Sequence, residues 1–137
     1  MQTPVGTLSV IEINGKVCAL NWADGDMSKE AEKQLDEYFN KQRKVFDFEY
    51  ELNGTSFQKK VWKALLNIPY GTTKTYKDIA EEVGSHPRAI GGAVGANPIP
   101  IFIPCHRVVG SSGKMTGFSG GEGIPTKETL LKLEGVL

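Results

Sequence analysis

Residues 75–95 read TYKDIAEEVGSHPRAIGGAVG, a pattern that predicts two short helices separated by a tight turn. Thr75 is suited to cap the first helix, and Gly84 to the left-handed position that follows a helix end. Ser85 is expected to cap the second helix, with Pro87 in its first turn. Two helices joined in this way are typical of a helix-turn-helix, whose second helix contacts DNA.

The second helix of this pair is unusual because most of its side chains are very small. One interpretation is close packing against a neighbouring helix, and many helix pairs with a glycine turn bind no DNA. The other is close approach of a nucleic-acid backbone, which a larger side chain would obstruct. The sequence leaves both interpretations open. The small residues are Ala89, Gly91, Gly92, Ala93 and Gly95.

Another helix is expected just before this pair. Thr55 and Gln58 have the spacing of a capping box, and the sequence Pro-Tyr-Gly at 69–71 is expected to end the helix. The C-terminal part of the chain is therefore predicted to be mostly helical. The expected buried face of this helix consists of Phe57, Val61, Trp62, Leu65 and Leu66.

The first third of the chain has a different pattern. Residues 8–13 and 16–22 flank Asn14-Gly15, the strongest two-residue signal for a β-hairpin. Residues 28–41 carry one apolar stripe at helical spacing. Residues 46–52 alternate between apolar and acidic side chains, which predicts a half-buried strand.

Together these patterns predict an α+β fold. We expect a small N-terminal strand and helix lobe over residues 1–53, followed by a mostly helical domain with a helix-turn-helix over residues 54–137. The 137 residues, 39% hydrophobic and 23% charged, exclude a disordered chain. No apolar run approaches the ~20 residues of a membrane span, no signal peptide is recognisable, and two cysteines cannot form a disulfide scaffold, so a cytoplasmic location without membrane association is expected.

Charge is unevenly distributed, although the chain is neutral overall with 16 basic and 16 acidic side chains. Residues 1–54 carry ten acidic and six basic groups, a net −4. Residues 55–137 carry six acidic and ten basic groups, a net +4. A basic half attracts a polyanion such as nucleic acid, but a difference of this size is equally typical of chance scatter over a solvated surface.

The most unusual segment is residues 99–110, IPIFIPCHRVVG. An apolar extended run leads to Cys105 and His106 through Pro104, whose fixed backbone angle holds the thiol in place. A thiol attacks as the thiolate, which a nearby imidazole and the cation of Arg107 favour. Since adjacent side chains on a strand point to opposite faces, we expect a water to connect Cys105 with His106.

The simpler alternative for this segment is an inert buried cysteine beside a surface histidine. A metal site is not expected, because no pair of cysteines or histidines has zinc-ligand spacing. Cys18, on an expected strand, is interpreted as a small core residue.

The motif Pro104-Cys105-His106-Arg107-Val108 resembles the active-site sequence of the O6-alkylguanine-DNA alkyltransferases, or methylated-DNA–protein-cysteine methyltransferases. The resemblance runs in family order from residue 54 to residue 137. It is carried further by Gly54 to Gln58, Val61-Trp62, Ile68 to Gly71, Thr75-Tyr76, Arg88 to Gly91, Asn97-Pro98, Ser119 to Gly121, Lys127, Leu130-Leu131 and Glu134-Gly135.

The resemblance implies a DNA repair protein that flips O6-alkylguanine out of double-stranded DNA and moves the alkyl group irreversibly to Cys105. It implies that His106 takes the thiol proton through a water and that Glu134 holds the imidazole. It also implies that Tyr76 donates to the base at N3 and that the backbone N–H of Ser119 lies near O6. Each molecule then acts once, as a monomer and without a cofactor.

The remaining implied roles concern the pocket and the DNA surface. Backbone carbonyls of Cys105 and Val108 would accept from the exocyclic amine of guanine, and Asn97 would stabilise the turn that shapes the pocket. Arg88 would fill the gap that the flipped base leaves. Substrate contacts are further expected from Phe118 and Lys127, and DNA contacts from Thr75, Ser85, Ala89 and Gly91.

The chain departs from the family pattern in three places. The turn over residues 84–87 is short, Phe118 replaces a tyrosine found in many members, and the segment 122–126 is slightly long. The main alternative function is a non-catalytic helix-turn-helix module that binds alkylated DNA, although relatives of that kind lack the cysteine. A plain DNA-binding module would not need Cys105 or Glu134, and a cysteine hydrolase would turn substrate over repeatedly.

Overall fold

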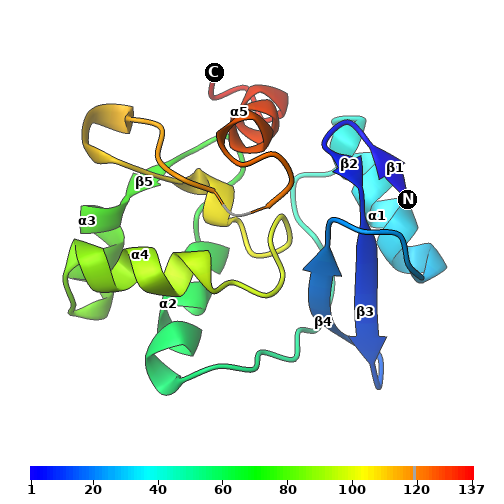
Figure 1. Ribbon diagram of the computed structural model, residues 1–137, viewed down its shortest axis with the longest axis horizontal. Helices are drawn as coiled ribbons and strands as arrows, with labels where there is room; N and C mark the ends of the chain where they lie inside the picture. Colours follow the sequence, from blue (N-terminus) through cyan, green and yellow to red (C-terminus); the bar gives the residue numbers. More distant parts are fainter. Residues whose placement is uncertain (119) are drawn as a thin grey trace.

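The computed structural model describes residues 1–118 and 120–137. Short strands and one helix form the N-terminal lobe (residues 1–53), which lies beside a group of three helices, while the last helix lies above the junction between them (Figure 1). The predicted α+β fold with a helix-turn-helix is therefore confirmed.

In the described part of the chain the strands form three two-stranded sheets, β1 with β2, β3 with β4 and β5 with β6. The strands are β1 (Gln2–Thr3), β2 (Gly6–Thr7), β3 (Ser9–Ile13), β4 (Lys16–Asn21), β5 (Lys74–Thr75) and β6 (Val108–Val109). The helices are α1 (Lys29–Phe39), α2 (Ser56–Leu66), α3 (Tyr76–Val83), α4 (Pro87–Gly95) and α5 (Ile124–Leu133), with two short 3-10 helices, η1 (Cys105–Arg107) and η2 (Ser111–Gly113).

The N-terminal hairpin and helix form as predicted. Antiparallel β3 and β4 are joined by Asn14 and Gly15, whose φ angles of 53° and 77° are those a tight hairpin turn requires. The side chain of Ser28 accepts a hydrogen bond from the backbone of Ala31 and starts α1. The helix ends at Phe39, two residues before the predicted end.

The strand predicted over residues 46–52 does not form. The segment makes one isolated bridge, in which Val17 donates to the carbonyl of Glu49 and accepts from the N–H of Glu51, each at 2.9 Å. The alternating burial is nevertheless present, because Phe46, Phe48 and Tyr50 pack their rings against Phe102. The alternation therefore reflects ring packing on one side of the segment, and among the described residues no neighbouring strand completes a ladder.

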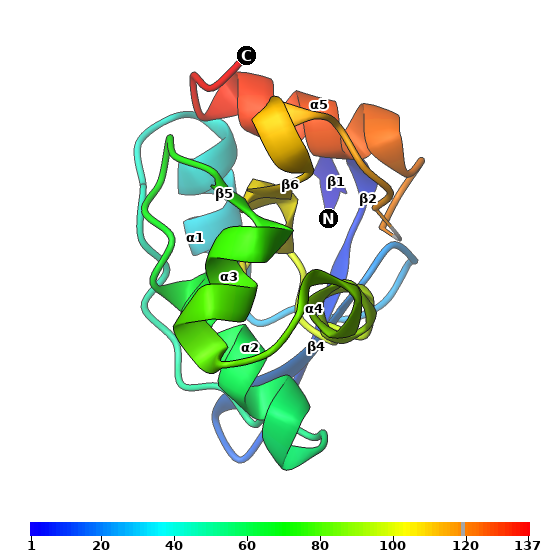
Figure 2. The same cartoon turned by 90° about the vertical axis from the view of Figure 1, so that its left-hand side faces the viewer.

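The helix-turn-helix consists of α3 and α4, which pack against each other and against α2 (Figure 2). Capping boxes start α2 at Thr55 and α3 at Thr75, and Gly84, with φ 75°, ends α3 in the left-handed conformation. Ser85 does not cap α4 as predicted. Its N–H donates to the carbonyl of Ala80 at 2.8 Å and so completes the end of α3, and the N-cap of α4 falls one residue later, on His86.

The buried apolar side chains form one continuous core that draws on both parts of the chain. Val61, Trp62 and Leu65 of α2 lie in it as predicted, and the indole of Trp62 donates to the carbonyl of Ala93 on α4 at 2.9 Å. Leu66 was placed on the buried face but is 38% exposed, because α2 ends there. Cys18 is only partly buried and donates to the carbonyl of Ile11.

The parallel pair of β5 and β6 brings the start of the helix-turn-helix next to the cysteine segment. Lys74 pairs with Val108 and Thr75 with Val109. Tyr76, which follows β5, and the 3-10 turn that begins at Cys105 and leads into β6 are therefore attached to paired strands. Within the described residues, no helix combines the length and the apolar character needed to cross a membrane.

Candidate active site

An extended conformation was predicted for the whole cysteine segment, but the structure differs at residues 105–107. The run up to Pro104 is followed by a single 3-10 turn over Cys105, His106 and Arg107. Pro104 accepts a hydrogen bond from the N–H of Arg107 at 3.0 Å, which closes this turn. Because of the turn, His106 and Arg107 point into the protein together and are both buried, where a strand would have separated them.

Asn97 fastens the loop that carries this segment. Its side-chain amide donates to the carbonyl of Ile103 at 3.0 Å, and its oxygen accepts from the N–H of Ile99 at 2.9 Å. Between these anchors Ile101 has a φ of 75°, which is rare for a β-branched residue and is strained. The two hydrogen bonds of Asn97 and the burial of Ile99, Ile101 and Ile103 hold this conformation in place.

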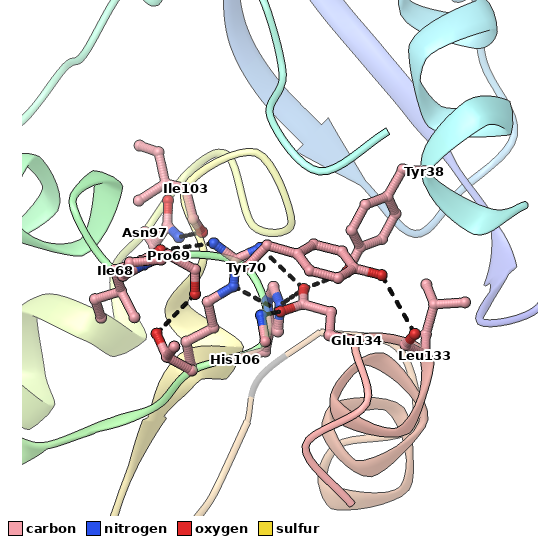
Figure 3. Close-up of polar contacts among 12 residues, drawn as sticks. Tyr38, Ile68, Pro69, Tyr70, Asn97, Ile103, His106, Leu133 and Glu134 are labelled. Carbon is pink, nitrogen blue, oxygen red and sulfur yellow. Dashed lines mark hydrogen bonds and ion pairs between the residues drawn. The ribbon is translucent and has the colours of Figure 1, made fainter. Parts of the chain in front are cut away.

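A buried polar network surrounds the carboxylate of Glu134, at the C-terminal end of α5 (Figure 3). Its Oε2 lies 2.6 Å from Nε2 of His106 and 2.6 Å from the hydroxyl of Tyr38. Arg107 donates from Nε to Oε1 at 2.8 Å and from Nη2 to Oε2 at 3.0 Å, and its Nη1 donates to the carbonyl of Ile68. The geometry of the Arg107–Glu134 pair is bidentate, the strongest arrangement of these two groups.

The tautomer of His106 follows from these contacts. A carboxylate can only accept, so Nε2 carries the proton and donates to Glu134. Nδ1 is then left with a free lone pair, and this buried nitrogen has no hydrogen-bond partner among the described residues. An unpaired buried nitrogen of this kind is the one position from which the imidazole can take up a proton.

The protonation states of the network are set by burial and by these hydrogen bonds. Burial raises the pKa of the Cys105 thiol to about 11, although Asn97 and the charge of Lys127 act in the opposite direction. Burial also lowers the pKa of His106, against the hydrogen bond to Glu134. Burial favours the neutral acid of Glu134, but hydrogen bonds from His106 and Arg107 outweigh it and keep its pKa below the ordinary range. The resting site therefore holds a neutral thiol and a neutral imidazole beside an ionised carboxylate.

The pKa shifts of His106 and Glu134 predict that acid destabilises the fold. Their unfolded values are about 6.5 and about 4.3, and both pKa values are lower in the folded protein, so the unfolded chain binds more protons as the pH falls. Stability should be fully present above each unfolded value and lost as the pH falls toward the folded one. Urea unfolding from about pH 7.5 down to about pH 4 should show a falling midpoint. In Glu134→Gln the lower part of this dependence should flatten, and an unchanged curve would contradict the assignment.

A second group of polar contacts lies on the other side of the cysteine. The hydroxyl of Tyr76 lies 2.9 Å from that of Thr116, and Lys127 donates to the carbonyl of Val108 at 2.6 Å and to the Thr116 hydroxyl at 3.4 Å. Lys127 is buried, and this lowers its pKa. Lys127 therefore fixes the backbone at Val108 and the side chain of Thr116.

Two adjoining hollows lead from the helix-turn-helix to Cys105. An outer one of about 350 Å³ is lined by residues that include Tyr76, Arg88 and Gly91. An inner one of about 60 Å³ is lined by Tyr76, Gly91, Val94, Gly95, Cys105, Gly117 and Phe118. Tyr76 and Gly91 line both hollows, so the two are adjacent, and Cys105 lines the inner one. We refer to the two hollows together as the passage. Phe118 offers no hydroxyl there, and its ring contacts Trp22 edge to face.

The structure thus brings most of the predicted site residues to two places. Cys105, Tyr76, Phe118 and Gly91 line the passage, and the contacts of His106 and Glu134 lie directly behind it. Among the expected DNA contacts, Thr75 is the N-cap of α3 and Ser85 lies between α3 and α4. Arg88 and Ala89 lie on α4, with Arg88 exposed. Ser119 lies outside the described residues.

Three contributors were missed or misassigned from the sequence. Arg107 was expected to favour the thiolate, but its guanidinium pairs with Glu134. Tyr38 was counted only as part of the apolar stripe of α1, and no local pattern distinguishes it from a core tyrosine. Thr116 stands in an irregular loop without any motif. The described residues contain no group of three or more His, Cys, Asp or Glu side chains arranged for a metal ion.

Comparison with known proteins gives consistent similarities. A family model described as 6-O-methylguanine DNA methyltransferase, DNA binding domain, matches residues 56–136. The methylated-DNA–protein-cysteine methyltransferase of Mycobacterium tuberculosis is 53% identical over 103 residues, which cover 74% of this chain and 61% of that protein. The protein of the same name from Methanosarcina acetivorans is 48% identical over 118 residues, or 84% of this chain and 74% of that protein. The chain thus spans about 61% of the length of the mycobacterial relative.

Solved structures agree with these similarities. The crystal structure of Mycobacterium tuberculosis OGT in complex with DNA has a TM-score of 0.89 at 42% identity, covering 98% of this chain and 89% of that one. Atl1 of S. pombe, in complex with damaged DNA that contains O6-carboxymethylguanine, has a TM-score of 0.50 at 32% identity over 61% of this chain and 79% of that one.

Proposed function

The chain belongs to the 6-O-methylguanine DNA methyltransferase family, and from this we propose that it repairs O6-alkylguanine in double-stranded DNA by transferring the alkyl group irreversibly to its own Cys105. The observation that carries the proposal is the order of groups behind the passage. Cys105 lies at its inner end, His106 has a free Nδ1, and Glu134 binds the opposite nitrogen of the ring. This is the arrangement of nucleophile, base and orienting group that activates a weak nucleophile.

The transfer itself needs a base and a leaving group. The Cys105 proton passes to Nδ1 of His106 through a water, and Glu134 stabilises the imidazolium. The thiolate then attacks the alkyl carbon, a carbon–sulfur bond forms, and the bond between this carbon and O6 breaks. Guanine leaves with the electron pair, helped by the Tyr76 hydroxyl at N3; the part that the family resemblance implies for Ser119 lies outside the described residues. No second nucleophile follows, so the thioether is permanent.

The pocket residues have supporting parts in this scheme. The carbonyls of Cys105 and Val108 accept from the exocyclic amine of guanine; Val108 already accepts from Lys127, but a carbonyl oxygen has two lone pairs. Lys127 acts through Val108 and Thr116, and Phe118 forms an apolar wall. Asn97 keeps the cysteine loop in its strained conformation.

Binding to DNA is assigned to α4. Arg88, Gly91, Gly92 and Gly95 follow one another at helical spacing on one face. A Cβ atom added at any of these three glycines would meet no atom within 4 Å beyond its chain neighbours and the backbone of its own helix, so packing against the rest of the chain does not require them to be small. This supports the interpretation that the face lacks side chains because DNA approaches it closely. Thr75, Ser85 and Ala89 contact DNA beside this face, and Arg88 takes the place of the flipped base.

Gly92→Ala provides a test of this face. Alanine is the better helix former, so the free energy of unfolding should rise by about 0.5–1 kcal/mol. The added methyl group should nevertheless weaken binding to duplex DNA about tenfold or more, because it holds the DNA away from the helix. Fluorescence anisotropy with a short duplex and urea unfolding measure the two effects. Thr129→Ala on α5 is the control, which should raise helix stability and leave DNA binding unchanged. Unaltered binding by Gly92→Ala would contradict the assignment.

Intact mass spectrometry distinguishes the transferase from the non-catalytic alternative, for which the likeness to Atl1 is the supporting observation. After incubation with a duplex that contains O6-methylguanine, the chain should gain the mass of one CH2 group, located on Cys105 and not on Cys18. A lesion binder would gain nothing. Repeated turnover, or a label on Cys18, would contradict the mechanism.

The remaining assignments complete the proposal. DNA binding and transfer belong to residues 54–137, with residues 1–53 as a small lobe, and the protein acts as a monomer without cofactor. A cytoplasmic location is supported by the two free cysteines, because a thiol acceptor needs a reducing compartment.

A further inference from the structure

Tyr38 belongs to α1, in the lobe that has no part in the chemistry proposed so far. Its side chain is fully buried, and its hydroxyl donates to Oε2 of Glu134 at 2.6 Å, across 96 positions of sequence (Figure 3). Among the described donors to Glu134, it is the only one from residues 1–53. The N-terminal lobe therefore reaches the group that orients His106.

Tyr38 shares one carboxylate oxygen with His106. Oε2 accepts from the Tyr38 hydroxyl and from His106 Nε2, both at 2.6 Å, and from Arg107 Nη2 at 3.0 Å. Oε1 accepts from Arg107 Nε at 2.8 Å and from the N–H of Gly71 at 3.2 Å. The carboxylate cannot rotate without breaking several of these bonds, and the bond from Tyr38 is as short as the one from His106.

We infer that Tyr38 is a positioning residue for alkyl transfer, which holds Oε2 of Glu134 against His106 and thereby sets the basicity of the imidazole. The inference rests on the proposed function, in which His106 is the base. It gives the N-terminal lobe a part in the reaction as well as in the fold.

The direction of the effect follows from the charges around His106. The ring is in the field of Glu134, Arg107 and Lys127, and it follows the neutral Cys105 thiol in the sequence. Tyr38 acts on it through its hydrogen bond to Glu134, whereas the Tyr70 hydroxyl lies near Glu134 but donates to Leu133. Burial and the charge of Glu134 raise the pKa of Tyr38, so its hydroxyl remains a donor at every accessible pH. A donor on Oε2 withdraws charge from it and makes it a weaker partner for the imidazolium. Loss of this donor should make His106 more basic.

The test is an NMR titration of the His106 ring nitrogens in the full chain. Tyr38→Phe keeps the ring that packs against Phe39, Phe46 and Tyr70 and removes only the hydroxyl. The His106 midpoint should rise by about 0.5–1 pH unit, which is a fraction of a hydrogen bond to a charged group. 3-Fluorotyrosine at position 38 keeps the hydroxyl as a more acidic donor and should lower the midpoint, so the test stands even if Tyr38→Phe does not fold. The pH profile of transfer should shift in the same direction.

Tyr70→Phe is the matched control, because the Tyr70 hydroxyl donates to the carbonyl of Leu133 at 3.3 Å and not to Glu134. It should change stability and leave the His106 midpoint in place. A midpoint unaltered by both changes at position 38, or shifted equally by Tyr70→Phe, would overturn the inference. If the wild-type chain transfers no alkyl group, the proposed function fails, whereas the titration still decides the role of Tyr38.

Discussion

Glu134→Gln is expected to slow alkyl transfer to Cys105 by about 100- to 10,000-fold, the usual range for the loss of assisted proton transfer. The amide carries no charge to stabilise the His106 imidazolium, and it can present either its oxygen or its N–H to Nε2. The histidine then loses both its partner charge and its fixed tautomer. His106→Ala, which removes the base itself, should show a loss in the same range. Single-turnover transfer from a methylated duplex measures the rate, and DNA affinity should change little.

The same substitution also leaves Arg107 without its partner. Breaking a buried pair in this way costs about 3–5 kcal/mol of stability, so the rate must be compared under conditions in which circular dichroism shows a folded protein. Glu128→Gln removes a carboxylate from α5 without touching the network and is the control for the change in charge. If a folded Glu134→Gln or His106→Ala protein transfers at the wild-type rate, the residue concerned is not in the relay.

The parts of this fold that were predictable are those with a local physical cause. The tight hairpin turn needs positive φ angles at both central residues, and Asn14 and Gly15 are residue types that adopt them at low cost. Thr55 and Thr75 satisfy backbone groups within three residues of themselves. Gly84 is needed for one left-handed residue. Each of these signals lies within a few positions of its effect.

The errors occurred where distant contacts determine the outcome. The alternation over residues 46–52 was real, but its cause is the ring of Phe102, and whether a strand forms depends on a neighbour that the alternation cannot specify. Ser85 has a side chain suited to an N-cap, but its N–H donates to the carbonyl of Ala80 at the end of α3, and His86 is the N-cap of α4.

Only the site residues that belong to the family's sequence motifs were predictable. Cys105, His106 and Glu134 were expected from the family resemblance, which rests on motifs and their order along the sequence and needs no structure. The 3-10 turn that directs Arg107 inward, and the arrival of Tyr38 from α1, depend on how the lobes pack. The contacts that tune proton transfer between Cys105, His106 and Glu134 therefore depend on tertiary packing, although these three residues can be identified in the sequence.

Arg88→Ala is expected to reduce transfer from duplex DNA on the order of 100-fold, because unstacking a base costs a few kcal/mol and no side chain then fills the gap. Reaction with free O6-benzylguanine, which needs no flipping, should be nearly unchanged. The exposed position of Arg88 at the rim of the outer hollow, on the same face as the bare glycines, is the basis for this selectivity.

Lys77→Ala is the control that separates loss of a positive charge from loss of the side chain that fills the gap of the flipped base. Lys77 lines the same hollow as Arg88 and carries the same charge. Each variant that loses one phosphate contact should lower the slope of log affinity against log salt by about 0.9. Only Arg88→Ala should then lose transfer from the duplex far beyond its loss of affinity. An equal loss on duplex and free base would place Arg88 in the pocket or the fold, and no loss on either would show that α4 is not the helix that replaces the flipped base.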